Sequence, residues 1–205
     1  MLNTYPKSRV PASRFLCSKH SGFSLLELMI GVAVLAILAS IAMPSFQTMI
    51  ESTKIRTAAE SIQNGLQKAR AEAIARNTNV AFTLGADSGW SICVNSCTTT
   101  PGITIESRPA SEGSKNVSRT SYAADLSAAL SVTFNNLGRV NNLGSALPNN
   151  LDGSKQLAKI DLTTPGSTHN LIVTIGKFDI PSQTYVGSSP RVCDPHATTG
   201  STSAC

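Results

Sequence analysis

The sequence predicts an α+β fold in which a long N-terminal α-helix, hydrophobic and then amphipathic, precedes an antiparallel β-sheet domain. Three observations lead to this prediction. Residues 28–50 contain no charged side chain, a run long enough for a helix to cross a membrane. Apolar residues then recur every three or four positions up to residue 77. Beyond residue 77 apolar residues recur at every second position in several segments, which is typical of strands.

Composition narrows the class of protein. The chain has 205 residues, 41% hydrophobic and 14% charged, with a formal charge of +5. This apolar content excludes a disordered chain, and the 14 glycines exclude a collagen-like one. Residues 1–22 carry four basic and no acidic side chains, whereas residues 23–205 carry 13 basic and 12 acidic ones. The positive charge therefore belongs to the N-terminus and does not indicate a nucleic-acid-binding body.

The first helical segment is predicted over residues 23–50. Its most apolar part, residues 28–43, has the composition of a transmembrane or filament-core helix. Basic residues precede it, and the positive-inside tendency places residues 1–22 in the cytoplasm.

The second helical segment is predicted over residues 51–77. Small aliphatic side chains fall on one face, as expected for a helix packed against a sheet: Ile55, Ala59, Ile62, Leu66, Ala69 and Ala73. The whole helix is expected to run from Phe23 to Arg76 and to stop at Asn77.

A β-sheet domain is predicted over residues 78–186, followed by a tail over residues 187–205. Segments rich in Val, Ile, Thr and Phe, bounded by turn residues, are the expected strands: 79–84, 89–94, 103–107, 130–135, 158–163 and 170–175. Residues 109–128 and 138–156 are expected to be loops. The tail is rich in Gly, Ser and Thr and is expected to be ordered only by its cysteines.

The apolar N-terminal segment allows three interpretations: a cleaved secretory signal, a plain membrane anchor, or a more specialised element. A secretory signal has a shorter apolar region that ends at a small-residue cleavage site. A plain anchor does not explain Glu27, which lies at the edge of the span, where a carboxylate at lipid depth costs up to about 3 kcal/mol.

The residues from Ser21 to Leu28, SGFSLLEL, resemble the class III signal-peptide processing site of type IV pilins and pseudopilins. The resemblance implies that a prepilin peptidase removes a leader by cutting between Gly22 and Phe23, and that Phe23 is then N-methylated. It makes Glu27 the fifth mature residue, where this family has its Glu. It also makes Pro44 the twenty-second, a position where these proteins often carry proline.

The position of Glu27 has a physical rationale beside the resemblance. Cleavage leaves a free amine on Phe23 in a setting of low dielectric constant. The Glu27 carboxylate of one subunit can neutralise the amine of a neighbouring subunit, and an unpaired buried charge is costly. We therefore expect Glu27 to set the register of subunits during assembly.

Further segments resemble the GspH/FimT group of minor pilins. They are 66–77 with 80–84, then 89–90, 133–139 and 191–195. The resemblance implies a type IV pilin-like fold and a minor pilin that primes or caps assembly of a type IV pilus. Two alternatives stay open: a GspH-type pseudopilin of type II secretion, and a pilus-tip subunit that binds DNA for uptake.

The resemblance also implies partners and a location. The partners are prepilin peptidase, other minor and major pilins or pseudopilins, and the inner-membrane assembly platform. The location is the bacterial inner membrane, with the N-terminus cytoplasmic and the β-domain periplasmic, and then the pilus or pseudopilus.

Four cysteines follow the predicted leader, which itself contains Cys17: Cys93, Cys97, Cys193 and Cys205. An even number of cysteines beyond the membrane favours disulfides. Three pairings are possible, of which the local one joins Cys93 to Cys97 and Cys193 to Cys205. A zinc site using these thiolates and His196 is the alternative, but its spacing departs from common zinc ribbons. We expect neither a metal nor a cofactor.

Catalytic motifs are not apparent in the sequence. There is no nucleophile elbow, phosphate loop or metal-binding helix motif, so we do not expect an enzyme. Lys177 and Arg191 are candidate DNA contacts in the C-terminal region. Affinity for phosphates grows with the number of charges neutralised, so two cations predict weak binding at most and DNA is an unlikely partner.

Overall fold

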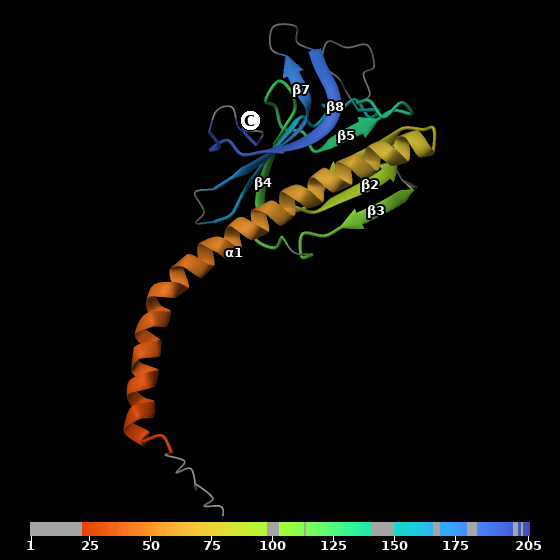
Figure 1. Cartoon of the computed structure of the whole chain (residues 1–205). Helices are drawn as coiled ribbons and strands as arrows, with labels where there is room; N and C mark the ends of the chain where they lie inside the picture. Colours follow the sequence, from red (N-terminus) through yellow and green to blue (C-terminus); the bar gives the residue numbers. More distant parts are fainter. Residues whose placement is uncertain are drawn as a thin grey trace, which may run out of the picture. The chain divides into compact units, whose positions relative to one another are not determined.

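The protein is described here by a computed structural model. It covers residues 22–97, 103–112, 114–140, 150–165, 169–179, 184–198, 201 and 203–205. The chain divides into two compact units, Met1–Met43 and Pro44–Cys205. The observed elements confirm the predicted class: one long helix is followed by antiparallel strands (Figure 1).

Helix α1 runs from Leu25 to Ala75, within two residues of the predicted bounds. It ends at Asn77, which has the left-handed φ of 49°. The amide of Thr78 donates to the carbonyl of Ala73 at 3.2 Å, and the amide of Asn77 donates to the carbonyl of Ile74 at 3.2 Å. These two hydrogen bonds form a Schellman motif, with Asn in the position that usually holds Gly.

The strands of the predicted β-sheet domain form two four-stranded antiparallel sheets. The strands are β1 Val80–Leu84, β2 Trp90–Val94, β3 Thr104–Arg108, β4 Ser118–Tyr122, β5 Ser131–Phe134, β6 Lys159–Thr163, β7 Leu171–Asp179 and β8 Thr184–Cys193. One sheet has the order β3-β2-β1-β5 and the other has the order β4-β6-β7-β8.

Two segments that were not predicted as strands contain strands. The segment 109–128, expected to be a loop, contains β4, whose sequence Ser-Arg-Thr-Ser-Tyr has no apolar alternation. The tail predicted to begin at residue 187 begins inside β8, which extends to Cys193. Pro190 lies in β8, and a proline is tolerated there because β8 is an edge strand.

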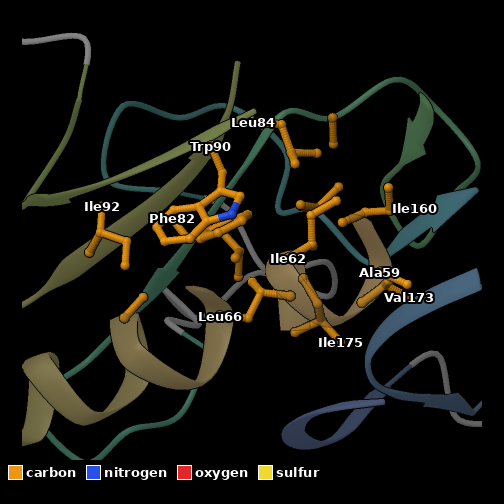
Figure 2. Packing of buried hydrophobic residues seen from close by; sticks show 14 of the residues in the cluster. Ala59, Ile62, Leu66, Phe82, Leu84, Trp90, Ile92, Ile160, Val173 and Ile175 are labelled. Carbon is orange, nitrogen blue, oxygen red and sulfur yellow. The ribbon is translucent and has the colours of Figure 1, made fainter. Parts of the chain in front are cut away.

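The core lies between the second half of α1 and the two sheets (Figure 2). The predicted stripe on α1 is fully buried, together with Ala58. The indole of Trp90 donates a hydrogen bond to the hydroxyl of Ser61 at 2.9 Å. At Gly65 a β-carbon would lie 2.8 Å from the Phe82 ring and 3.0 Å from the Trp90 ring. Gly65 therefore allows the helix to approach β1 and β2 more closely than any other residue would.

Buried amide side chains complete the outer edge of β5. The Thr133 amide donates to the Gln156 side-chain oxygen at 2.9 Å, and the Asn150 side chain donates to the Ser131 carbonyl at 3.1 Å. Asn150 also accepts from the Thr133 hydroxyl at 2.9 Å. Both amides are almost fully buried, and they supply hydrogen-bond partners to backbone groups on the edge of β5 that faces away from β1.

Candidate functional site

The first part of α1 is an exposed apolar surface. The most apolar stretch of the helix has a mean hydropathy of 2.5 and none of it is buried, so the helix is long and apolar enough to cross a membrane. The exposed large side chains from residue 23 to residue 50 are Phe23, Leu25, Leu26, Leu28, Met29, Ile30, Val32, Val34, Leu35, Ile37, Leu38, Ile41, Met43, Phe46, Met49 and Ile50. Burying such a set in lipid or against other helices stabilises by tens of kcal/mol, on the order of 1.5–3 kcal/mol per side chain.

The predicted processing site lies just before this helix. Gly22, Phe23 and Ser24 are not helical, and Phe23 is 83% exposed. A β-carbon at Gly22 would meet no atom within 4 Å among the described residues. The first helical hydrogen bond runs from the Leu28 amide to the Ser24 carbonyl at 3.1 Å. The bond between Gly22 and Phe23 is therefore open to solvent and outside the helix.

Glu27 lies in the first turn of α1. In the described part of the chain no hydrogen bond or ion pair reaches its carboxylate, and its side chain is exposed. A carboxylate in the first helical turn interacts favourably with the helix dipole. The position thus leaves a negative charge at the start of the apolar surface, available to a positive group from outside the chain.

Pro44 lies inside α1 and begins the second compact unit. It has no amide hydrogen, so the carbonyl four residues before it loses its usual helical partner. Hydroxyl groups on both sides of Pro44 donate to carbonyls of the same helix at 2.7–2.9 Å; they belong to Ser40, Thr48, Ser52, Thr53 and Thr57. These hydroxyls are satisfied without any group outside α1.

The four cysteines form two disulfides, which is the local pairing. Cys93 and Cys97 join the end of β2 to the turn that follows, with 5.2 Å between their α-carbons. Cys193 and Cys205 close the C-terminal tail onto the end of β8, with 5.1 Å between their α-carbons. Because these sulfur atoms are bonded to one another, they cannot serve as the thiolate ligands of the alternative zinc site. Among the described residues no group of three or more His, Cys, Asp or Glu side chains is placed to hold a metal.

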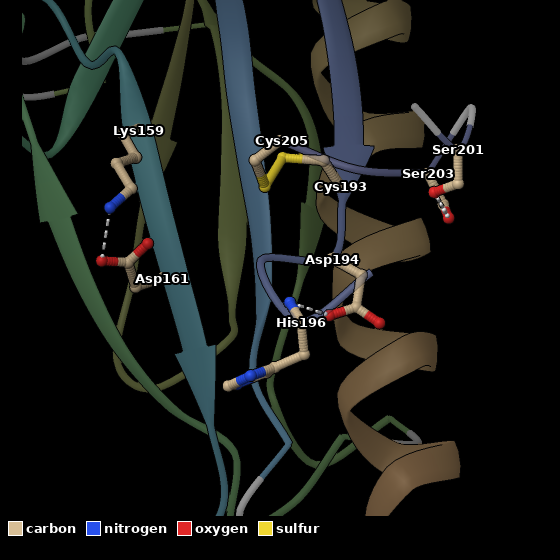
Figure 3. Close-up of a disulfide and its surroundings, with 8 residues drawn as sticks. All are labelled: Lys159, Asp161, Cys193, Asp194, His196, Ser201, Ser203 and Cys205. Atoms are coloured by element: carbon tan, nitrogen blue, oxygen red, sulfur yellow. Dashed lines mark hydrogen bonds and ion pairs between the residues drawn. A yellow bond between two sulfur atoms is a disulfide. The ribbon is translucent and has the colours of Figure 1, made fainter. Parts of the chain in front are cut away.

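The tail folds back onto the second sheet. The Asp194 amide donates to the Ser203 carbonyl at 2.7 Å, and the Asp194 carboxylate accepts from the His196 amide at 2.8 Å (Figure 3). The His196 ring lies 2.9 Å from the Asn170 side-chain oxygen, next to the start of β7. The described residues of the tail are thus held by hydrogen bonds as well as by the disulfide.

Of the two candidate DNA contacts, only Arg191 has a described side chain. Arg191 pairs with Thr174 across β8 and β7, and Thr174 pairs with Lys159 across β7 and β6, so these side chains share one face. Lys159 is ion-paired with Asp161 at 3.0 Å. Lys177 lies on β7 beyond a shift in register, and its side chain lies outside the described part of the structure.

One residue of the site was missed by reasoning from the sequence. Ser24 occupies the N-cap position of α1, since its carbonyl accepts the first helical bond. Ser24 and Glu27 have the spacing of a capping box, but in the described part of the chain neither side chain makes a hydrogen bond to the first helical turn.

Two family models match parts of the sequence. Residues 17–43 match the prokaryotic N-terminal methylation motif, and residues 58–173 match the family described as type II transport protein GspH. No curated protein matches the sequence. Among solved structures, the type IV minor pilin FimU of Pseudomonas aeruginosa strain PAO1 is similar, with 16% identity and a TM-score of 0.42 over 66% of this chain and 94% of that chain. Because the GspH match spans more than half of the sequence, the chain belongs to the GspH family and is a minor pilin or pseudopilin with a prepilin-type N-terminus.

Proposed function

We propose that the protein is a minor pilin that primes or caps the assembly of a type IV pilus. The observation that carries the proposal is the wholly exposed apolar surface at the start of α1, on a chain whose other unit has its own buried core. Such a surface needs lipid before assembly and the helices of neighbouring subunits after it. The globular domain then selects the neighbours.

The precursor is anchored in the inner membrane by residues 23–50, with residues 1–22 in the cytoplasm and the β-domain in the periplasm. Prepilin peptidase hydrolyses the bond between Gly22 and Phe23, so that one water is consumed and a carboxylate and an amine are produced. The exposed, non-helical backbone at this bond supports the proposal. Other pilins and the inner-membrane assembly platform are the further partners.

Glu27 then pairs with the amine of a neighbouring subunit as the helix leaves the lipid. The exposed carboxylate in the first helical turn supports this role. The test is Glu27→Ala, scored separately for membrane insertion and for recovery in sheared filaments. We expect normal insertion and at least a tenfold loss from filaments, whereas Glu60→Ala, an exposed acid later in α1, behaves like the wild type. Equal recovery of the two variants contradicts the role of Glu27.

A second function is favoured by the family match, whose description names type II transport. In that case the chain is a pseudopilin of type II protein secretion. We prefer the pilus because of the ordered, disulfide-closed tail after β8, which extends the surface offered to a neighbour.

The deciding experiment deletes the gene in its own host and scores surface pili and secreted protein activity side by side. Loss of pili with intact secretion supports the pilus. Loss of secretion with intact pili overturns it in favour of the pseudopilin. Restoration by the wild-type gene but not by Glu27→Ala ties either phenotype to assembly.

A further inference from the structure

Leu126 is an exposed leucine in a backbone conformation that leucine rarely adopts. It lies in the turn between β4 and β5, has a φ of 63° and is 72% exposed. The other four non-glycine residues with a positive φ in the described part of the chain are all Asn or Asp, which tolerate this region better. Leu126 is therefore unfavourable both for the turn and for the solvent around it, which points to a role outside its own subunit.

Hydrogen bonds hold the turn that presents Leu126. The Leu126 amide donates to the Ala123 carbonyl at 3.1 Å, and the Ala123 amide donates to the Ser127 carbonyl at 2.8 Å. The Asp125 carboxylate accepts from the amide and the hydroxyl of Ser127 and forms an ion pair with Lys155. A side chain on such an ordered turn loses little conformational freedom on binding, as is typical of an interface anchor.

A second exposed apolar surface lies at the end of α1. We call it the α1-end surface and define it by Ile74, which is 51% exposed, and Leu137, which is 69% exposed in the turn after β5. The turn that carries Leu137 lies directly on α1, because a β-carbon on Gly138 would lie 2.6 Å from the end of the Ile74 side chain. The Asn136 side chain also donates to the Asn77 side chain at 3.1 Å. This surface is therefore as firmly placed as the Leu126 turn.

Positive charge flanks the α1-end surface. Arg70 lies beside it, since its side chain would meet the same β-carbon on Gly138 at 3.2 Å. Arg139 follows Gly138 and is exposed. In the described part of the chain no carboxylate forms an ion pair with either arginine. Two positive charges are thus available beside the exposed apolar side chains.

Negative charge flanks the Leu126 turn. The ion pair between Asp125 and Lys155 joins this turn to the turn that carries Asp152. The hydrogen bond from the Ser154 hydroxyl holds the pKa of Asp152 below its ordinary value, so this carboxylate is ionised at neutral pH. Because Lys155 compensates only Asp125, one negative charge remains beside Leu126.

We infer that the Leu126 turn of one subunit docks on the α1-end surface of a second copy of this chain. One turn precedes β5 and the other follows it, so the two surfaces lie toward opposite ends of that strand and the contact joins two subunits. Apolar side chains meet on both sides, and opposite charges flank them. A contact between two different surfaces is heterologous, and its repetition gives an open chain of subunits. The inference goes beyond the proposed function, because it holds for a pilus and for a pseudopilus alike.

The test is disulfide cross-linking of the full chain in mild detergent, with Cys17→Ser in every sample so that only introduced thiols are free. Subunits with Leu126→Cys are mixed with differently tagged subunits that carry Leu137→Cys, and the mixture is oxidised with copper phenanthroline. We expect a linked heterodimer in the mixture and only background dimer from either variant alone. Asn64→Cys, at an exposed position earlier in α1, replaces Leu137→Cys in the matched control and should also give background. A mixture that gives no more dimer than this control overturns the inference.

Two further variants test the chemistry of the contact. Arg139→Glu in the Leu137→Cys subunit should lower the yield of heterodimer about fivefold, whereas Arg139→Lys should leave it nearly unchanged. An equal yield from the two variants contradicts the contact. Leu126→Gly relieves the strain of the positive φ, so its Tm should equal or exceed that of the wild type. A lower Tm would show that Leu126 stabilises its own subunit and would overturn the inference.

Discussion

Replacing Gly65 with Ala is expected to destabilise the protein, although the same change stabilises most helices. In an exposed helix interior, Gly→Ala contributes about 1 kcal/mol of stability. At Gly65 the added carbon would lie 2.8 Å from a Phe82 ring atom and 3.0 Å from the Trp90 ring. Both rings are buried in the core and have no space in which to move aside. The helix must therefore shift away from β1 and β2.

The magnitude follows from the opposing terms. Overpacking of a well-filled core costs about 1–3 kcal/mol, and the gain in helix propensity offsets about 1 kcal/mol of it. A shift of α1 also lengthens the hydrogen bond between Trp90 and Ser61, which is 2.9 Å long. The first two terms leave a loss of about 0–2 kcal/mol, and the weakened hydrogen bond adds about 1 kcal/mol. We therefore expect the free energy of unfolding to fall by about 1–3 kcal/mol, or about 2–12 °C in Tm for a protein of this size.

The assay is denaturant unfolding of the detergent-solubilised full chain, followed by intrinsic fluorescence. The sequence contains one tryptophan, so the signal comes from Trp90 at the contact itself. Asn64→Ala, on the neighbouring exposed position of α1, is the control and should be neutral or slightly stabilising. If Gly65→Ala is stabilised as much as the control, α1 does not pack on these rings and the reasoning is refuted.

Three further changes test other contacts. Ser61→Ala leaves the buried indole of Trp90 without an acceptor, and unfolding measurements should show a loss of about 1–3 kcal/mol; an unchanged midpoint would contradict this. The ion pair with Lys155 lowers the pKa of Asp125 below its ordinary value, so its stabilising effect is complete above about pH 4 and is lost as the pH falls further. In Asp125→Asn the free energy of unfolding should therefore fall less between about pH 4 and lower pH than it does in the wild type. An equal fall in both proteins would show that the ion pair does not stabilise the fold. Cys205→Ala opens the C-terminal loop, and the chain-entropy estimate is a loss of about 3 kcal/mol in the free energy of unfolding. An unchanged unfolding midpoint would show that the disulfide does not stabilise the fold.

The helix and strands that were predicted correctly are those in which apolar residues recur with a clear period. Runs of apolar and β-branched residues bounded by turn residues placed β1, β2, β3, β5 and β6 within about one residue, and all of these strands except β3 contribute buried side chains to the core. β4 was missed because four of its five residues are Ser, Arg or Thr and it gains order from its pairing with β6. β8 was missed because Gly, Ser and Pro within it are signals of a break, which an edge strand tolerates.

The candidate site was predictable where it depends on local sequence. The exposed apolar surface and the processing site follow directly from a short run of residues. The choice among three disulfide pairings was not predictable, since it depends on which strand ends meet in space. The close approach at Gly65 and the buried amides of Asn150 and Gln156 were not predictable either. From the sequence alone, a glycine or an amide side chain indicates a turn or an exposed position.

The self-satisfied hydroxyls of α1 have a consequence for its change of surroundings. Ser40 donates to the carbonyl of Ile37 at 2.7 Å, and four hydroxyls after Pro44 donate to helix carbonyls in the same way. Ser40 and Thr48 lie within the apolar segment 23–50, and because their hydroxyls have acceptors inside the helix, exchanging lipid chains for protein side chains breaks neither bond. If the helix moves from a bilayer into a filament, as proposed, the transfer is between two apolar surroundings, and the shape of the neighbouring side chains rather than their polarity decides which neighbours are favoured.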